Sequence, residues 1–122
     1  MKLRPAVVID LEPYRSADVT PLVVRFRQER GHVLVLLRGD LDLGTCPVLH
    51  EMIGRILVSS RGSVVLDLSQ LDFIDATGVG ALVRARSGLE ADGRVLTIRG
   101  LRPFARRVFA LTGFVSQVPV GS

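Results

Sequence analysis

The 122-residue sequence contains one cysteine, two histidines, one tyrosine and no tryptophan. The single cysteine, Cys46, excludes an internal disulfide, and His32 and His50 alone cannot supply the usual ligands of a zinc ion. Because Cys46 lies beside Pro47 near the start of a predicted helix, we interpret it as a small packing residue. These absences leave little with which to build a cysteine or histidine mechanism, and we predict a chain without metal or cofactor.

A long uninterrupted hydrophobic run is also missing. Hydrophobic residues make up 48% of the chain, but no uncharged apolar run approaches the roughly 18 residues that a membrane-spanning helix needs. At the amino terminus, the apolar stretch meets Asp10 and Glu12 too early for a secretory signal. We therefore expect one soluble domain with no membrane insertion and a cytoplasmic location.

Lysine is nearly absent as well, because Lys2 is the only lysine among 16 basic residues. The net charge of +4 comes from an excess of arginine in the carboxy-terminal part, where Arg99, Arg102, Arg106 and Arg107 lie close together. Few aromatic residues that could stack on bases accompany this cluster. A solvated face or an acidic protein partner is the favoured interpretation, and no direct binding of nucleic acid is expected.

The chain divides into an amino-terminal arm, residues 1–20, and a single domain, residues 21–122. The arm has a short apolar segment at 6–9 followed by a more polar stretch, and we expect it to be loosely held. The domain opens with two runs of β-branched and large apolar residues, Leu22–Phe26 and Val33–Leu37, which are separated by polar residues and a glycine. This pattern predicts a β-hairpin.

Helical and strand patterns alternate after the hairpin. Thr45 can cap a helix whose apolar positions recur every three or four residues: Val48, Leu49, Met52, Ile53, Ile56 and Leu57. The remaining predicted elements are a strand at 63–68, a helix from Thr77 to the Asp92-Gly93 stop, a strand at 95–98, a helix from Pro103 to Gly113 with an apolar stripe of Phe104, Val108 and Leu111, and a strand at 114–118. This alternation predicts an α/β fold with a mixed, mainly parallel sheet, an N-terminal hairpin and helices packed on it.

The most informative stretch leads from the strand at 63–68 through an apolar pair, Phe73-Ile74, into a turn that opens a helix. Asp75 or Thr77 can accept hydrogen bonds from the free amides of that helix. We interpret Gly78 and Gly80 as positions where the backbone of a partner can come close. Such an amino-terminal helix turn also suits an anion, including a phosphate carried on the turn itself.

This stretch resembles the STAS domains of bacterial anti-sigma factor antagonists. In that family, a strand of the type Val-x-Leu-Asp-Leu leads to Phe-Ile/Met-Asp-Ser-Ser/Thr-Gly and a helix, as Val64–Leu68 leads here to Phe73–Gly78. Gly39-Asp40-Leu41-Asp42 is similar to the family's Gly-Glu/Asp-Leu-Asp, and Gly113-Phe114 to the close of its last helix. The resemblance runs in order from Leu22 to Val118 and implies a STAS-like single domain.

The sequence departs from the family pattern at Ala76, which stands where the family has the serine that a partner kinase phosphorylates. Asp75 matches the motif aspartate, Thr77 the second hydroxyl position and Gly78 the glycine. Three alternatives remain open: Thr77 accepts phosphate instead, the protein stays in the unphosphorylated binding state, or it serves a scaffold that is never phosphorylated. The unphosphorylated binder is favoured.

Asp40 and Asp42 form a pair of acids in a turn at the end of a strand. Paired carboxylates can serve acid–base catalysis or hold magnesium, but a turn rich in Asp and Gly at the end of a strand is usually only a turn. The resemblance places this loop next to the Asp75 turn, so we assign Asp40 and Asp42 to the partner-facing surface.

The resemblance implies a non-enzymatic binding module. It would capture an anti-sigma factor of the histidine-kinase-like ATPase type and so free a sigma factor for transcription, with the contact centred on Asp40, Asp42, Asp75, Ala76, Thr77 and Gly78. The alternative is a scaffold or adaptor component of a signalling complex or a membrane transporter. An enzyme is least favoured, because the sequence shows no nucleophile–base pair and no metal cluster.

Overall fold

The computed structural model of the chain describes residues 7–9 and 22–113. The strand predicted at 114–118 lies outside the described residues. The described elements follow in chain order: β1 (Val7–Ile9), β2 (Val23–Glu29), β3 (His32–Leu41), α1 (Cys46–Ser59), β4 (Ser63–Ile74), α2 (Ala76–Ala91), β5 (Leu96–Arg99) and α3 (Pro103–Thr112).

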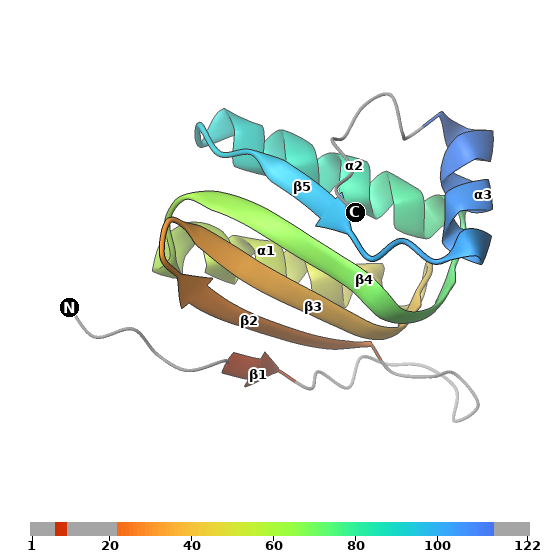
Figure 1. Cartoon of the computed structure of the whole chain (residues 1–122), viewed down its shortest axis with the longest axis horizontal. Helices are drawn as coiled ribbons and strands as arrows, with labels where there is room; N and C mark the ends of the chain where they lie inside the picture. The colour runs from red at the N-terminus through yellow and green to blue at the C-terminus, as the bar shows by residue number, and fades with distance from the viewer. Residues whose placement is uncertain (1–6, 10–21, 114–122) are drawn as a thin grey trace.

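The strands form one mixed sheet in the order β1-β2-β3-β4-β5 (Figure 1). β2 pairs antiparallel with β3 through a tight turn in which Gly31 has a φ of 83°, a left-handed value that favours glycine. β3 pairs parallel with β4, and β4 with β5, through helical crossovers. The predicted hairpin and the predicted mixed α/β fold are therefore confirmed.

β1 adds a strand that the sequence did not predict. It pairs antiparallel with the outer edge of β2, with Val8 opposite Arg25. These three residues belong to the segment that we interpreted as a loosely held arm. Within the described part of the arm, the chain thus extends the sheet instead of lying apart from it.

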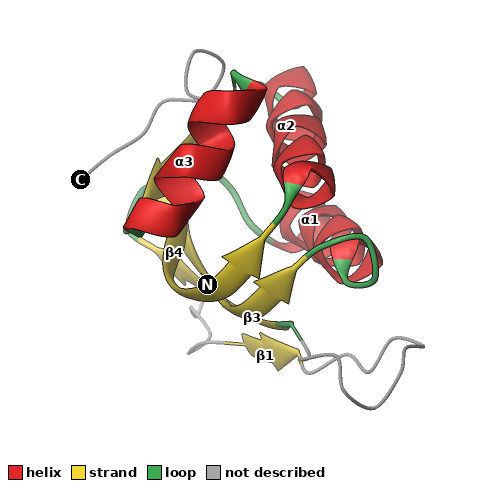
Figure 2. Cartoon of the chain, turned by 90° about the vertical axis from the view of Figure 1, so that its right-hand side faces the viewer, coloured by secondary structure: helices red, strands yellow, loops and turns green. Residues whose placement is uncertain are grey.

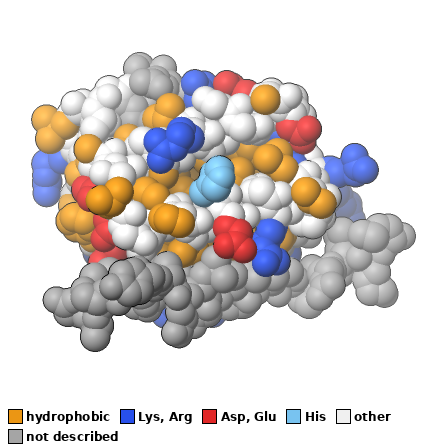
Figure 3. Space-filling view, turned by 180° about the vertical axis from the view of Figure 1, so that it is seen from behind, with side chains coloured by type: hydrophobic (Ala, Val, Ile, Leu, Met, Phe, Trp, Pro, Cys, Tyr) orange, Lys and Arg blue, Asp and Glu red, His pale blue; other side chains and the backbone are white. Residues whose placement is uncertain are grey.

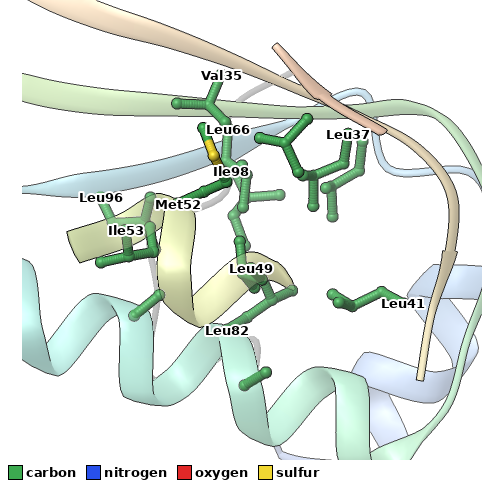
Figure 4. Close-up of a cluster of buried hydrophobic side chains, with 14 of the residues drawn as sticks. Val35, Leu37, Leu41, Leu49, Met52, Ile53, Leu66, Leu82, Leu96 and Ile98 are labelled. Carbon is green, nitrogen blue, oxygen red and sulfur yellow. The ribbon is translucent and has the colours of Figure 1, made fainter. Parts of the chain in front are cut away.

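Helices α1 and α2 lie side by side on one face of the sheet, and α3 lies near the carboxyl ends of β4 and β5 (Figures 1 and 2). Alternate residues of the inner strands point toward the helices and are buried, as Val35, Leu37 and Leu66 show in Figure 4. From α1, the predicted apolar face joins this core with Val48, Leu49, Met52, Ile53 and Ile56 buried and Leu57 partly buried. None of the described helices is long and apolar enough to cross a membrane.

The last helix differs in part from its prediction. Pro103 occupies its first turn, and Gly113 ends it with a left-handed φ of 75°, as predicted. Leu111, which we expected in the apolar stripe, is instead 88% exposed, and Phe109 is fully buried. The stripe was therefore wrong at its carboxyl end, because the buried side of the helix runs through Ala105 and Phe109 and Leu111 lies off that side.

Candidate functional site

The carboxyl ends of β3 and β4 lie next to each other at one edge of the sheet. Asp40 is aligned with Phe73, and Leu41 with Ile74, across the parallel pairing. This edge is at the right-hand side of Figure 1 and faces the viewer in Figure 2. The register places the loop after β3 beside the turn that opens α2, as the family resemblance implied.

Asp75 is the N-cap of α2. Its backbone is extended, and its Oδ1 accepts a hydrogen bond of 2.8 Å from the amide of Gly78. The helix begins at Ala76, one residue earlier than predicted. Of the two capping residues considered, Asp75 therefore holds the helix start. Ala76 and Thr77 are exposed in the first turn.

The loop after β3 is held by Thr45, whose side chain is fully buried. The Thr45 hydroxyl donates to the carbonyl oxygen of Asp40 at 2.7 Å and accepts from the amide of Asp42 at 3.0 Å. In return, Asp42 Oδ1 accepts from the Thr45 amide at 3.1 Å. Thr45 does occupy the N-cap position of α1, but its side chain makes no capping hydrogen bond, so the predicted cap was wrong. Its hydroxyl instead fixes the Asp40–Asp42 backbone.

Two contacts join the loop to the turn. A Cβ added at Gly78 would overlap the backbone carbonyl oxygen of Leu41 and would lie 2.8 Å from Ile74 Cγ1. The Cys46 thiol at the start of α1 lies 3.6 Å from the carbonyl oxygen of Thr77. Gly78 is buried, so the close approach that we had assigned to a partner is made to the chain's own β3.

Cys46 is nine-tenths or more buried, in agreement with the packing role predicted for it. Burial raises the pKa of its thiol, and the negative charges of Asp75 and Asp42 raise that pKa further against the opposing charge of Arg84. The thiol therefore stays protonated near neutral pH. Within the described ranges, no group of three or more His, Cys, Asp or Glu residues could hold a metal ion.

The sequence interpretation missed two exposed apolar side chains at this edge. Leu43, in the loop after β3, is 74% exposed, and Phe73, near the end of β4, is 46% exposed. We had grouped Phe73 with Ile74, which is only 2% exposed. The alternation of side chains along a strand could have revealed the exposure of Phe73, because neighbouring residues such as Phe73 and Ile74 point to opposite faces of the sheet.

The basic cluster predicted near the last helix is partly neutralised. Arg99 pairs with Asp67 at 3.2 Å. Arg102 donates to the carbonyl oxygen of Leu71 at 3.0 Å, lies 3.7 Å from Asp72 and stacks over Phe104. Arg106 and Arg107 are exposed on α3. The cluster thus serves in part to join α3 and β5 to β4.

Comparison with known proteins identifies the family. A family model described as Mlab, STAS domain, matches residues 24–118. The chain belongs to the STAS domain family. The fold and the order of the motifs around Asp42 and Asp75 agree with this assignment, which confirms the resemblance noted in the sequence.

Three of the similar proteins are described as anti-sigma factor antagonists. An anti-sigma-B factor antagonist from Listeria monocytogenes is 27% identical over 93 residues, which cover 76% of this chain and 82% of the relative. BtrV of Bordetella bronchiseptica, described as a putative anti-sigma factor antagonist, is 27% identical over 92 residues, with 75% of this chain and 79% of the relative covered. The crystal structure of an anti-sigma factor antagonist from Mycobacterium paratuberculosis superimposes with a TM-score of 0.67 at 27% identity and covers 88% of this chain and 89% of that one.

Proposed function

We propose that this STAS domain is an anti-sigma factor antagonist. It captures an anti-sigma factor of the histidine-kinase-like ATPase type and so releases a sigma factor for transcription. The anti-sigma factor antagonists of Listeria and Mycobacterium that it resembles support the general role. The type of partner rests on the family resemblance.

The observation that carries the proposal is the alignment of Leu41 with Ile74. It brings the two family motifs together as one edge, although Asp42 and Asp75 are far apart in the sequence. Each motif has a fixed backbone, because Asp42 is bound to Thr45 and Asp75 to Gly78. A rigid edge of this kind suits protein recognition, since little conformational entropy is lost when a partner binds.

Position 76 cannot carry a phosphate, because Ala76 has no hydroxyl group. Asp75 makes the side-chain cap of α2, so Thr77 is not needed as the cap. Thr77 is exposed and is the only residue with a hydroxyl group in the motif Phe73–Gly78. We propose that the domain acts as an unphosphorylated binder and that the usual switch at position 76 is absent. Phosphate analysis of the protein from its native cells checks this, and phosphate found on Thr77 would restore a switch.

Binding measurements with purified anti-sigma factors from the same genome test the function. We expect one of them to form a complex, Thr77→Glu to weaken it by about tenfold or more, and Asp75→Ala to weaken it by removing the N-cap. Ser87→Glu is the matched control, because Ser87 is an exposed residue further along the same helix. Failure of every candidate to bind wild-type protein would refute the proposed function. Unchanged affinity of both site variants would instead refute the site.

A further inference from the structure

Two large apolar side chains are exposed beside the proposed binding turn. Leu43 lies two residues beyond the end of β3, and Phe73 lies one residue before the last residue of β4. They are 74% and 46% exposed, whereas their neighbours Leu41 and Ile74 are buried. Because Leu41 and Ile74 are aligned in the sheet, the backbones of Leu43 and Phe73 lie at the same end of two neighbouring strands.

Ala76 extends this apolar character onto α2. It is exposed in the first turn of the helix, at the position where the family resemblance places a serine. A methyl group at that position removes a polar group from the surface between the two motifs. The edge is therefore more apolar than the family pattern predicts.

Acidic residues adjoin the apolar ones in the chain, since Asp42 precedes Leu43 and Asp72 precedes Phe73. Asp42 and Asp75 are half-buried, and one oxygen of each is bound within its own turn. The Asp72 side chain is 64% exposed, with Arg102 at 3.7 Å. An apolar centre with a polar, charged rim is the usual anatomy of a protein interface. A partner that complements this edge has apolar side chains at its centre and basic ones around them.

Exposed apolar side chains also occur elsewhere, so exposure alone does not mark the edge. Hydrophobic atoms reach the surface at several separate places on the helix-bearing side (Figure 3). Val58, near the carboxyl end of α1, is 89% exposed, and Leu111, near the end of α3, is 88% exposed. Val58 is separated from the edge by nearly the whole length of α1, because that helix starts at Cys46 beside the turn.

We infer that Leu43 and Phe73 are the apolar anchors of the contact with the anti-sigma factor and that the partner meets them with an apolar centre and a basic rim. This inference rests on the proposed function and specifies the chemistry of the partner surface. Burial of the two anchors holds the complex together, and the acidic rim steers the encounter. Substitutions of Leu43 or Phe73 therefore raise the dissociation rate of the complex, and added salt lowers its association rate.

Kinetic binding measurements with the anti-sigma factor that wild-type protein captures test the inference. We expect Leu43→Ser and Phe73→Ser each to raise Kd by about tenfold or more, mainly through faster dissociation. Val58→Ser and Leu111→Ser, which remove aliphatic side chains even more exposed than that of Leu43, leave Kd within about twofold. Raising the salt concentration slows association of the wild type and of the anchor variants alike.

The possible outcomes separate the two proposals. If wild-type protein binds no anti-sigma factor, the proposed function fails and the inference fails with it. If wild-type protein binds but the two anchor variants behave like the two controls, the inference is overturned and the function stands. A loss of affinity that comes from slower association alone would also overturn the anchoring role. Leu43→Ser keeps the test valid if Phe73→Ser lowers stability, because the Leu43 side chain is 74% exposed.

Discussion

The backbone carbonyl oxygen of Leu41 lies directly against the Cα of Gly78, so the first turn of α2 packs on the end of β3. No side chain fits between them, because a Cβ at Gly78 would overlap that oxygen. The contact joins the two strand ends that carry the motif residues. Packing within the domain thus explains this glycine without a partner.

The first prediction compares two glycines of α2. Gly78→Ala forces the helix start away from β3, and we expect it to lower the free energy of unfolding by about 1–3 kcal/mol. Gly80→Ala is the control, because its Cβ would meet only Arg84 Nη1 at 3.5 Å. Because alanine favours a helix interior more than glycine does, Gly80→Ala should raise the free energy of unfolding by about 0.5–1 kcal/mol. Urea denaturation measures both, and equal effects of the two substitutions would contradict the packing role of Gly78.

Local patterns predicted the elements well where one face of an element meets the core. The three- and four-residue spacing in α1 identified its buried residues, because a helix with an apolar stripe has one stable orientation. The spacing could not show that the buried side of α3 runs through Ala105 and Phe109 and leaves Leu111 exposed. It could not show β1 either, because a three-residue strand is defined by the edge it joins.

The local structure of the candidate site was predictable in part, but its contacts were not. Asp75 as an N-cap follows from local chemistry. The adjacency of Asp42 and Asp75 depends on parallel register, which is set by tertiary structure, and it came only from the family resemblance. The role of Gly78 was misjudged for the same reason, because its neighbour Leu41 belongs to another strand.

The second prediction concerns Asp67, whose carboxylate accepts from the Ser69 amide at 2.8 Å and from Arg99 Nε at 3.2 Å. Partial burial opposes ionisation, but the hydrogen bonds from Ser69 and Arg99 prevail and lower the pKa of this carboxyl below its ordinary value. Because the folded pKa is below the unfolded one, the stabilisation is fully present above the unfolded pKa and is lost as the pH falls through the folded pKa.

Asp67→Asn should therefore lower the free energy of unfolding more at about pH 7 than at about pH 2.5. Urea denaturation of the wild type and the variant at both pH values gives the comparison. A stability difference that stays the same at the two pH values would show that ionised Asp67 does not stabilise the fold.

The third prediction uses Cys46, which is 9% exposed and whose thiol has a raised pKa because of burial. In native protein at about pH 8, we expect it to react with an aromatic disulfide reagent at least about tenfold more slowly than in urea-unfolded protein. The variant Cys46→Ala/Val58→Cys is the control, since it places the thiol at an exposed position of the same helix. Equal rates for native wild type and this control would contradict the packing of α1 against the turn.

The fourth prediction concerns Arg94, a buried arginine that the sequence did not mark as structural. It is 7% exposed, and its guanidinium donates to three backbone carbonyl oxygens, those of Gly62 at 2.7 Å, Ser60 at 3.2 Å and Ile56 at 3.3 Å. A further bond of 3.0 Å reaches Ser60 Oγ. Since Ile56 and Ser60 lie at the carboxyl end of α1, the positive charge also meets the negative end of the helix dipole.

Arg94→Met removes the guanidinium donor from the carbonyl oxygens of Gly62 and Ser60 and one of several donors from that of Ile56. We therefore expect a loss of about 3 kcal/mol or more in the free energy of unfolding. Arg94→Lys should recover only part of that loss, because one ammonium group cannot reach all the oxygens that the guanidinium spans. Arg55→Met removes an exposed arginine that pairs with Glu51 at 3.6 Å, and it should cost less than about 1 kcal/mol. Thermal and urea denaturation compare the three variants. If Arg94→Met costs no more than Arg55→Met, the guanidinium does not hold the end of α1 to the segment before β5, and that junction depends on apolar packing alone.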